Sequence, residues 1–332
     1  MMKRTFIFVM AALTTFGGHD MVTPAIGAEV TVKALTALPK NRYTNKPFWV
    51  FLEDVNANGK GVLQLKYIGG PEAVPVREQM GALARGIFDL FFGPASYFGG
   101  RVPETTAVNA SNMTAMELRR NGALKLLSKA YNKRANAEYL GYFGSGYSLA
   151  LYLTNPPKMT ADGQVALKGL KIRGSTVFLP FMRSLGINMI SIPVPQMYTA
   201  LERGVVEGAG WTTIIGAAGW GKFLKYRVRP FFYQGDMGIA MNLKSFQSLP
   251  KGARDYLMKM VVKHEALAHE WYAKAQEDES KRLRSVGVKD VVMKGKVAQK
   301  FLKTAYDSLW ASMQSRLSKA EVDALRGKFF KK

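Results

Sequence analysis

Residues 167–211 contain Lys168-Gly-Leu-Lys-Ile-Arg173, Pro193-Val-Pro195 and Val206-Glu-Gly-Ala-Gly-Trp211, and their pattern is the most informative of the sequence. In this stretch, three short apolar runs alternate with two stretches of helical spacing. The runs are Leu170–Arg173, Met189–Ile192 and Val205–Ala209, and the helical stretches are Phe178–Leu185 and Gln196–Arg203. Strand, helix, strand, helix, strand with short connections predicts a parallel sheet covered by helices.

Three residues stand at the carboxyl ends of these predicted strands, where ligands of such sheets bind. They are Arg173, Val194 in the second connection, and Trp211. A guanidinium can bond to both oxygens of a carboxylate at once, which an ammonium cannot. An arginine, an apolar wall and an indole at one sheet edge therefore suit a small organic carboxylate.

The order of the motifs in this stretch is also informative. Lys168–Arg173 is followed by Leu185-Gly186, Pro193-Val-Pro195, Tyr198-Thr-Ala-Leu-Glu-Arg-Gly204 and Val206-Glu-Gly208. In this order of motifs the chain resembles the solute-binding subunit of TRAP (tripartite ATP-independent periplasmic) transporters. The resemblance in layout covers nearly the whole chain after the predicted signal peptide, and the matching motifs are densest in residues 167–211. The resemblance implies an α/β fold, namely a two-lobe, type II-like periplasmic binding protein with discontinuous lobes, hinge strands and a long spanning helix.

The first part of the chain repeats the strand and helix pattern of residues 167–211. Strands are predicted at Glu29–Ala37, Val62–Ile68 and Ile87–Phe92, with helices at Pro47–Val55 and Glu78–Ala84. The third strand leads into a loop rich in glycine and aromatic residues. In the family this loop faces the ligand, so the resemblance makes Gly93, Pro94 and Tyr97 candidate ligand contacts.

A long helix is predicted in the last third of the chain, because no glycine or proline occurs between Gly252 and Gly287. Some thirty helical residues would span about 45 Å, enough to cross two lobes. We expect a first lobe of residues 29–152 and 238–275 and a second lobe of residues 153–237 and 276–332. Lobe closure would be a hinge motion around the ligand.

The N-terminus predicts export. Lys3 and Arg4 precede the apolar run Thr5–Phe16, and a cleavage site ends at Ala28, so residues 1–28 read as a signal peptide. The chain has no cysteine, which excludes disulfides and a lipid anchor at that site. The net charge of +23 becomes +22 when Lys3, Arg4 and Asp20 are removed, and such a field attracts anions. The charge would be explained equally well if the secreted proteins of the source lineage were generally basic.

Catalytic and metal motifs are missing from the sequence. His264 and His269 are five residues apart, one more than the spacing that places two zinc ligands on one helix face, so we expect surface histidines or histidines with internal partners. We therefore expect no metal, no cofactor and no nucleic-acid partner, and no catalysed reaction. An exported enzyme that uses the same cleft, and a secreted binder of polyanions, stay open as alternatives.

The resemblance extends the candidate site. It gives Arg173 the role of clamping the substrate carboxylate, while Trp211, with Thr212 beside it, is either a ligand contact or a buried core residue. Tyr152 is the one polar-tipped ring on the expected crossing strand. Val194 stands where relatives often carry phenylalanine, and Phe178 either walls the pocket or packs its own helix.

Together these residues predict a monocarboxylate ligand with an apolar or aromatic body, with a small dicarboxylate or keto acid as the alternative. The expected setting is a periplasmic monomer that delivers the anion to the small and large membrane subunits of a TRAP transporter.

Overall fold

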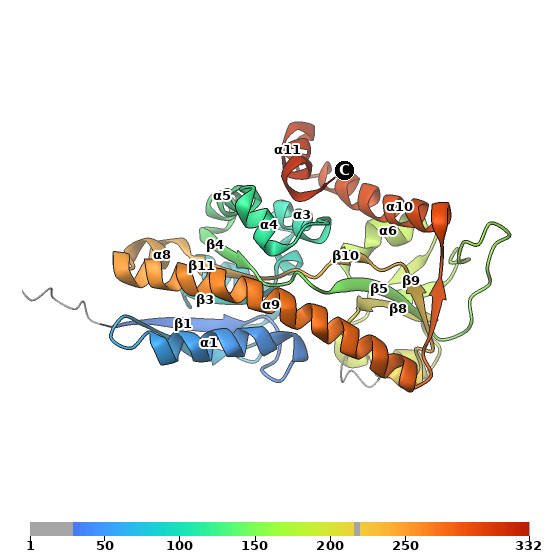
Figure 1. Ribbon diagram of the computed structural model, residues 1–332, viewed down its shortest axis with the longest axis horizontal. Helices are drawn as coiled ribbons and strands as arrows, with labels where there is room; N and C mark the ends of the chain where they lie inside the picture. Colours follow the sequence, from blue (N-terminus) through green and yellow to red (C-terminus); the bar gives the residue numbers. More distant parts are fainter. Residues whose placement is uncertain (1–28, 216–219, 332) are drawn as a thin grey trace, which may run out of the picture.

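The structure is a computed structural model that describes residues 29–215 and 220–331, so the predicted signal peptide lies outside the described residues. Two β-sheets follow one another along the long axis of the molecule, and helices cover both (Figure 1). This arrangement confirms the predicted α/β class. No helix in the described part of the chain is long and apolar enough to cross a bilayer.

The first sheet has five strands. Their order is β2 (Leu63–Gly69), β1 (Val30–Thr36), β3 (Leu90–Pro94), β11 (Met237–Asn242) and β4 (Ala137–Tyr142). Strand β1 is parallel to both β2 and β3, whereas β11 is antiparallel to β3 and β4. The three predicted strands of the first part of the chain are thereby confirmed, and helices α1 (Lys46–Asn58) and α2 (Val76–Ala84) connect them.

The second sheet contains the strands of residues 167–211. Its order is β12 (Lys289–Val292), β9 (Tyr226–Arg229), β5 (Ser148–Leu153), β8 (Gly208–Thr212), β6 (Lys171–Arg173) and β7 (Asn188–Ile190), with β10 (Phe232–Gln234) paired to β5. Strand β6 is parallel to β7 and β8, as predicted. Helices α6 (Leu179–Ser184) and α7 (Met197–Glu202) provide the connections.

Strand β8 begins later than the apolar run at Val205 suggested. Val205 instead belongs to the C-terminal end of α7, because the Val205 amide donates to Ala200 O and the Gly204 amide donates to Leu201 O. Gly204 has a φ of 66°, the left-handed conformation that closes a helix C-terminus. The apolar character of Val205 therefore belongs to a helix cap and not to a strand.

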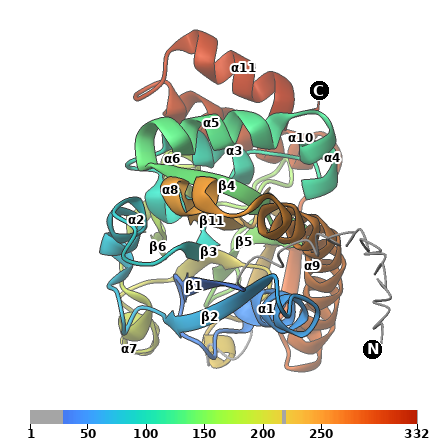
Figure 2. The same ribbon diagram turned by 90° about the vertical axis from the view of Figure 1, so that its left-hand side faces the viewer.

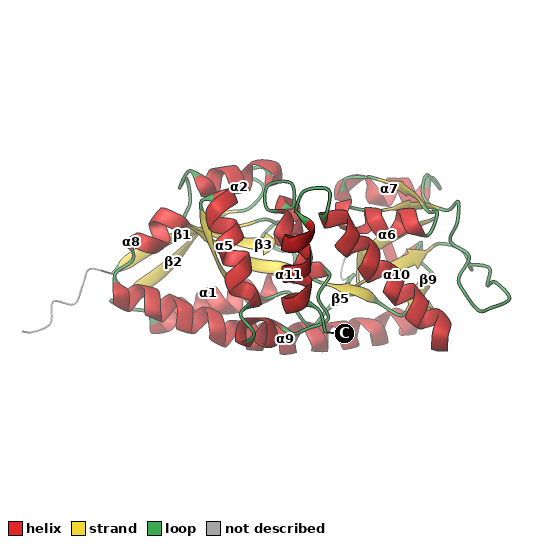
Figure 3. Ribbon diagram, turned by 90° about the horizontal axis from the view of Figure 1, so that it is seen from above, coloured by secondary structure: helices red, strands yellow, loops and turns green. Residues whose placement is uncertain are grey.

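The predicted spanning helix is confirmed as α9 (Lys251–Ser285), which has 35 residues and would measure about 52 Å at the usual rise. It runs beside both sheets (Figures 1 and 3). Leu257 and Val261 pack into the core of the first sheet, and Leu283 packs into an apolar cluster of the second. The remaining helices include α3 (Thr106–Asn109), α4 (Ala115–Arg120), α5 (Ala123–Ala135), α8 (Leu243–Ser248), α10 (Gly295–Met313) and α11 (Lys319–Phe329).

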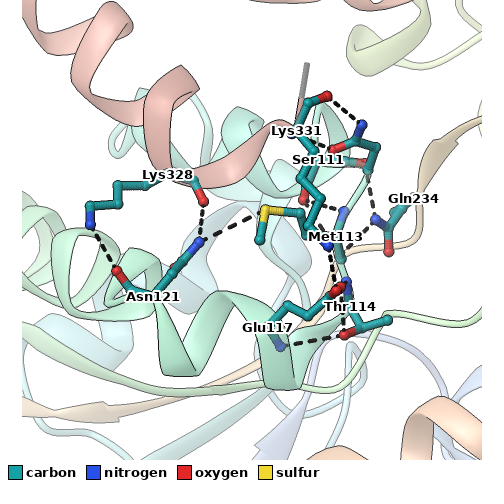
Figure 4. A network of polar contacts seen from close by, with 9 residues as sticks. Ser111, Met113, Thr114, Glu117, Asn121, Gln234, Lys328 and Lys331 are labelled. Carbon is teal, nitrogen blue, oxygen red and sulfur yellow. Dashed lines mark hydrogen bonds and ion pairs between the residues drawn. The ribbon is translucent and has the colours of Figure 1, made fainter.

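The C-terminal helices divide between the two sheets, which differs from the expectation that residues 276–332 all belong to the second lobe. Helix α10 packs against α6, but α11 lies against α3 and α5 beside the first sheet (Figure 2). Polar contacts fix this position: Asn121 Nδ2 donates to Lys328 O, and Lys331 Nζ pairs with Glu117 (Figure 4). The buried apolar face of α11 adds to them, since a short helix needs a packed face to be stable.

Two short segments carry the chain between the sheets, residues 144–147 and 234–237, and α9 makes a third crossing. Strand β5 already belongs to the second sheet, so the first crossing precedes residue 148, earlier than the boundary expected near residue 152. The two segments lie in close contact: the Gly235 amide donates to Tyr147 O, and a Cβ at Gly235 would lie 1.9 Å from the Tyr147 ring. Only glycine fits at position 235.

Candidate functional site

A cavity of about 480 Å³ lies between the two sheets. The carboxyl ends of β1, β3, β6 and β8 open toward it, as expected for a ligand site of α/β sheets. Its wall combines residues of both sheets and of the second crossing segment. They include Leu38, Arg42, Val76, Pro94, Ser96, Tyr97, Asn109, Tyr147, Ser175, Val177, Phe178, Val194, Trp211, Thr212 and Asp236.

Trp211 holds two arginines beside this cavity. The Arg173 guanidinium carbon lies 4.8 Å from the centre of the Trp211 rings, and the Arg42 guanidinium carbon lies 5.5 Å from it. Arg42 comes from the loop after β1 and Arg173 from the end of β6, so each sheet supplies one cation. The Trp211 indole also contacts Trp220 edge to face, at 4.8 Å between ring centres. Both guanidiniums can stack favourably on the indole.

Arg173 differs in its partners from Arg227, the other buried arginine among the described residues, and from the half-buried Arg119. Arg227 is paired with Asp290 at 2.7 Å and Arg119 with Glu265. Arg173 is 6% exposed, donates from Nε to Ile192 O at 3.1 Å, and has no partner for Nη1 among the described residues. Burial lowers the pKa of Arg173. An ion pair with a ligand would supply the charge compensation that the described part of the chain does not.

The Trp211 indole and Tyr97 complete this end of the cavity. Trp211 Nε1 is buried and has no acceptor among the described residues. Desolvation at the cavity wall raises the pKa of Tyr97, although 46% of the residue is exposed; the negative charge of Asp236 also raises it, and the positive charges of Arg173 and Arg42 lower it.

Asp236 and Asn109 bring acceptors to the same cavity. Asp236 is 7% exposed and its Oδ2 accepts a hydrogen bond from the Ser96 amide at 2.7 Å. Burial raises the pKa of Asp236, and the hydrogen bonds from Ser96 oppose that effect. Asn109 donates from Nδ2 to Gln234 O at 2.8 Å, and its buried Oδ1 has no donor among the described residues.

Most of the residues that the sequence singled out meet at this cavity. Arg173 is not part of the cavity wall, but its guanidinium lies against the ring of Trp211, which is. The cavity wall itself carries Pro94, Tyr97, Phe178, Val194, Trp211 and Thr212.

Two candidates lie elsewhere. Tyr152 is fully buried in the second sheet, where its hydroxyl donates to Thr212 O at 3.1 Å. Gly93 lies inside β3, and a Cβ there would be 2.2 Å from the Cβ of Ala37. Tyr152 therefore supports the strand that carries Thr212, and Gly93 allows β1 and β3 to approach.

Sequence reasoning missed Arg42, Asp236 and Asn109. Arg42 could have been found, because it follows the first strand at its carboxyl end and the same rule was applied to Arg173. Asp236 and Asn109 carry no such signal. They reach the cavity through the crossing segment and α3, whose positions depend on the packing of the two sheets.

Both histidines of the described residues have internal partners. His264 Nε2 lies 2.7 Å from Asp54 Oδ2, and His269 Nδ1 lies 3.1 Å from Ser145 Oγ. Residues 29–215 and 220–331 contain no cluster of acidic residues and histidines that could hold a metal ion.

Comparison with known proteins identifies the family. The chain matches the bacterial extracellular solute-binding proteins, family 7, over residues 36–317. A solute-binding protein of Albidiferax ferrireducens is 22% identical over 277 residues, which cover 78% of each chain. A monocarboxylate 2-oxoacid-binding periplasmic protein of a Nostoc species is 22% identical over 85% of this chain and 73% of its own.

Solved structures share the fold. An extracytoplasmic solute receptor of Bordetella pertussis that binds pyroglutamic acid superposes with a TM-score of 0.75 at 16% identity, over 90% of this chain and 99% of that one. A TRAP periplasmic solute-binding protein of Rhodoferax ferrireducens with bound malonate has a TM-score of 0.75 at 18% identity, over 90% and 98%. Both are receptors and not enzymes. Since the family match covers most of the sequence, the chain belongs to the bacterial extracellular solute-binding proteins, family 7, and is a TRAP-type solute-binding protein, as the motif order predicted.

Proposed function

We propose that this protein captures a small organic acid anion, a monocarboxylate with an apolar or aromatic body, in the cavity between its two sheets. The observation that carries the proposal is the pair of guanidiniums on Trp211. Neither Arg42 nor Arg173 forms an ion pair with any described residue, and Arg173 Nη1 lacks a hydrogen-bond acceptor. A carboxylate placed beside Trp211 would satisfy both arginines with charge-assisted hydrogen bonds.

The rest of the wall favours an apolar ligand body. Leu38, Val76, Val177, Phe178 and Val194 line the cavity, and burying apolar ligand surface against them would add to the affinity. Relatives support the ligand class. Their names report 2-oxo monocarboxylates for the Nostoc protein, pyroglutamic acid for the Bordetella receptor and malonate for the Rhodoferax protein.

We further propose that each sheet is the core of one lobe, with crossings at residues 144–147 and 234–237 and through α9. Because one arginine comes from each sheet, a bound carboxylate would hold the lobes together. The closed receptor would then deliver its ligand, as a monomer, to the small and large membrane subunits of a TRAP transporter.

Export is part of this proposal. Cleavage after Ala28 would leave Glu29, the first described residue, as the N-terminus. N-terminal sequencing of the protein from the periplasmic fraction should begin at Glu29. Finding only full-length protein in the cytoplasm would contradict export.

The ligand can be identified directly. Native mass spectrometry of freshly purified protein should show a mass increment equal to one small organic acid, lost on denaturation. Calorimetric titration with monocarboxylates that have aliphatic and aromatic bodies should then give saturable binding with one site. Absence of binding by every organic acid in such a panel, with the protein folded, would overturn the proposal.

A further inference from the structure

The cavity carries acceptors as well as donors. Asp236 lies in the crossing segment between β10 and β11 and lines the cavity, with Oδ2 held by the Ser96 amide at 2.7 Å. Among the described residues no lysine, arginine or histidine forms an ion pair with it, although only 7% of the residue is exposed. A carboxylate that is buried without a cation needs hydrogen-bond donors in its place.

Asn109 presents a second acceptor at the same cavity. It is 1% exposed, and its Nδ2 is committed to Gln234 O at 2.8 Å, which leaves Oδ1 without a donor in the described part of the chain. The amide orientation follows from that bond to a backbone carbonyl. Asn109 Oδ1 is therefore a buried acceptor without a donor in the described part of the chain, whereas hydrogen bonds from Ser96 and from the Asn109 side chain already lower the pKa of Asp236.

The charges of the cavity limit what can supply those donors. Of the lining residues, Arg42 and Asp236 are charged, and Arg173 adds a second cation against the Trp211 ring. The balance is one positive charge, which one carboxylate neutralises. A ligand with two carboxylates would bring a second anion into the cavity with Asp236, and a zwitterion would leave the positive charge uncompensated.

We propose that Asp236, with Asn109, makes this receptor selective for monocarboxylates that also carry a neutral hydrogen-bond donor, a hydroxyl or an amide N–H. The carboxylate binds Arg42 and Arg173, and the donor binds Asp236 Oδ1 or Asn109 Oδ1. This inference rests on the proposed carboxylate site and adds the rule by which ligands are chosen.

A matched set of probes tests the rule. Butanoate, pentanoate and hexanoate would each be compared with the same acid carrying a terminal hydroxyl, carboxamide, ammonium or second carboxylate. The hydroxy or carboxamide acid of the best chain length should bind the wild type at least about tenfold tighter than the unsubstituted acid, because a hydrogen bond to a charged group contributes that much. The ammonium and dicarboxylate analogues should bind more weakly than the hydroxy acid.

The Asp236→Asn variant should invert this preference. Its single amide oxygen can still accept from the Ser96 amide, which leaves an NH₂ group for the cavity. The hydroxy or carboxamide acid should lose about tenfold in affinity, while the dicarboxylate should gain relative to it. Asp255→Asn, which removes the same charge from an exposed site on α9, serves as the matched control and should keep the wild-type order.

Three outcomes decide the matter. If no carboxylate binds the folded wild type, the proposed function fails. If carboxylates bind but the donor makes no difference to the wild type, this inference alone is overturned. If Asp236→Asn lowers the melting temperature and weakens all probes by the same factor, Asp236 only orders the Ser96 loop, and the selectivity rule is wrong.

Discussion

Arg173 is the residue on which the proposed site most depends. If it shares a buried carboxylate with Arg42, truncation of one partner would cost about 3–5 kcal/mol, which is two to four decades of affinity. Arg42 remains in the variant, so we expect Arg173→Ala to weaken binding about a hundredfold, and Arg173→Lys to recover part of the loss because it keeps the charge without the planar fork. Calorimetric titration measures both.

Folding provides a second readout for the same residue. Arg173 is 6% exposed and bonded to Ile192 O, so its truncation should also lower the free energy of unfolding, by about 1.5–3 kcal/mol. Arg183→Ala removes the same charge from the exposed side of α6 and should change neither quantity. A folded Arg173→Ala protein that binds within threefold of the wild type would place the carboxylate clamp elsewhere.

For single residues, the sequence could predict which side chains lie at the carboxyl ends of strands. It could not predict which side chains reach the cavity from the segments that connect the two sheets. Arg173, Val194 and Trp211 were predicted because each follows an apolar run, and all three lie at or beside the cavity. A crossing between lobes near residue 152 would bring Tyr152 to the site. Strand β5 belongs to the second sheet, which buries that ring.

At the scale of elements, the contact between α9 and α1 carries a pH dependence. His264 is 2% exposed, its Nε2 lies 2.7 Å from Asp54 Oδ2, and its ring contacts Phe51 at 5.4 Å between ring centres. Burial lowers the pKa of His264, although the hydrogen bond to Asp54 opposes the change. The fold therefore prefers the neutral ring, and its contribution to stability is present above the unfolded pKa of about 6.5 and is lost as the pH falls through the lower folded value.

We expect the melting temperature of the wild type to fall between pH 8 and pH 5 by more than that of His264→Gln. His269→Gln, which replaces a half-buried histidine of the same helix that does not contact Asp54, is the matched control and should keep the wild-type slope. Comparing the variants with the wild type cancels the buried carboxylates Asp236 and Glu265, whose pKa values burial raises. Parallel curves for His264→Gln and the wild type would refute this assignment.

Long helices and strands were predictable where the periodicity of apolar residues agreed with the positions of glycine and proline. The segment without glycine or proline became α9, and the three strands of the first sheet lie close to their predicted positions. The short strands and helices of residues 167–211 also lie close to their predicted positions, but the residue at which a helix ends and the sheet against which a helix packs were not predictable, because tertiary packing decides them. Val205 caps a helix, and α11 lies beside the first sheet because Asn121 and Glu117 hold its end.

At the scale of the whole molecule, the position of the two arginines links binding to shape. Arg42 belongs to the first-sheet side and Arg173 to the second, and both lie on one indole. Without an anion between them, these like charges repel each other across the cleft, which favours separated lobes. A carboxylate reverses the sign of the interaction, so ligand binding should shift the population toward the closed form.

Small-angle scattering with the acid identified by mass spectrometry measures this shift. The radius of gyration of the wild type should decrease at saturating ligand. The Arg42→Gln variant retains Arg173 and Trp211 on the second-sheet side, so it should still bind the ligand, but more weakly. At saturation its radius of gyration should decrease less than that of the wild type, because the first-sheet side no longer offers a positive charge to the carboxylate. Equal compaction of the variant and the wild type would mean that Arg42 does not couple the lobes, and an unchanged wild-type profile would mean that the cleft is rigid.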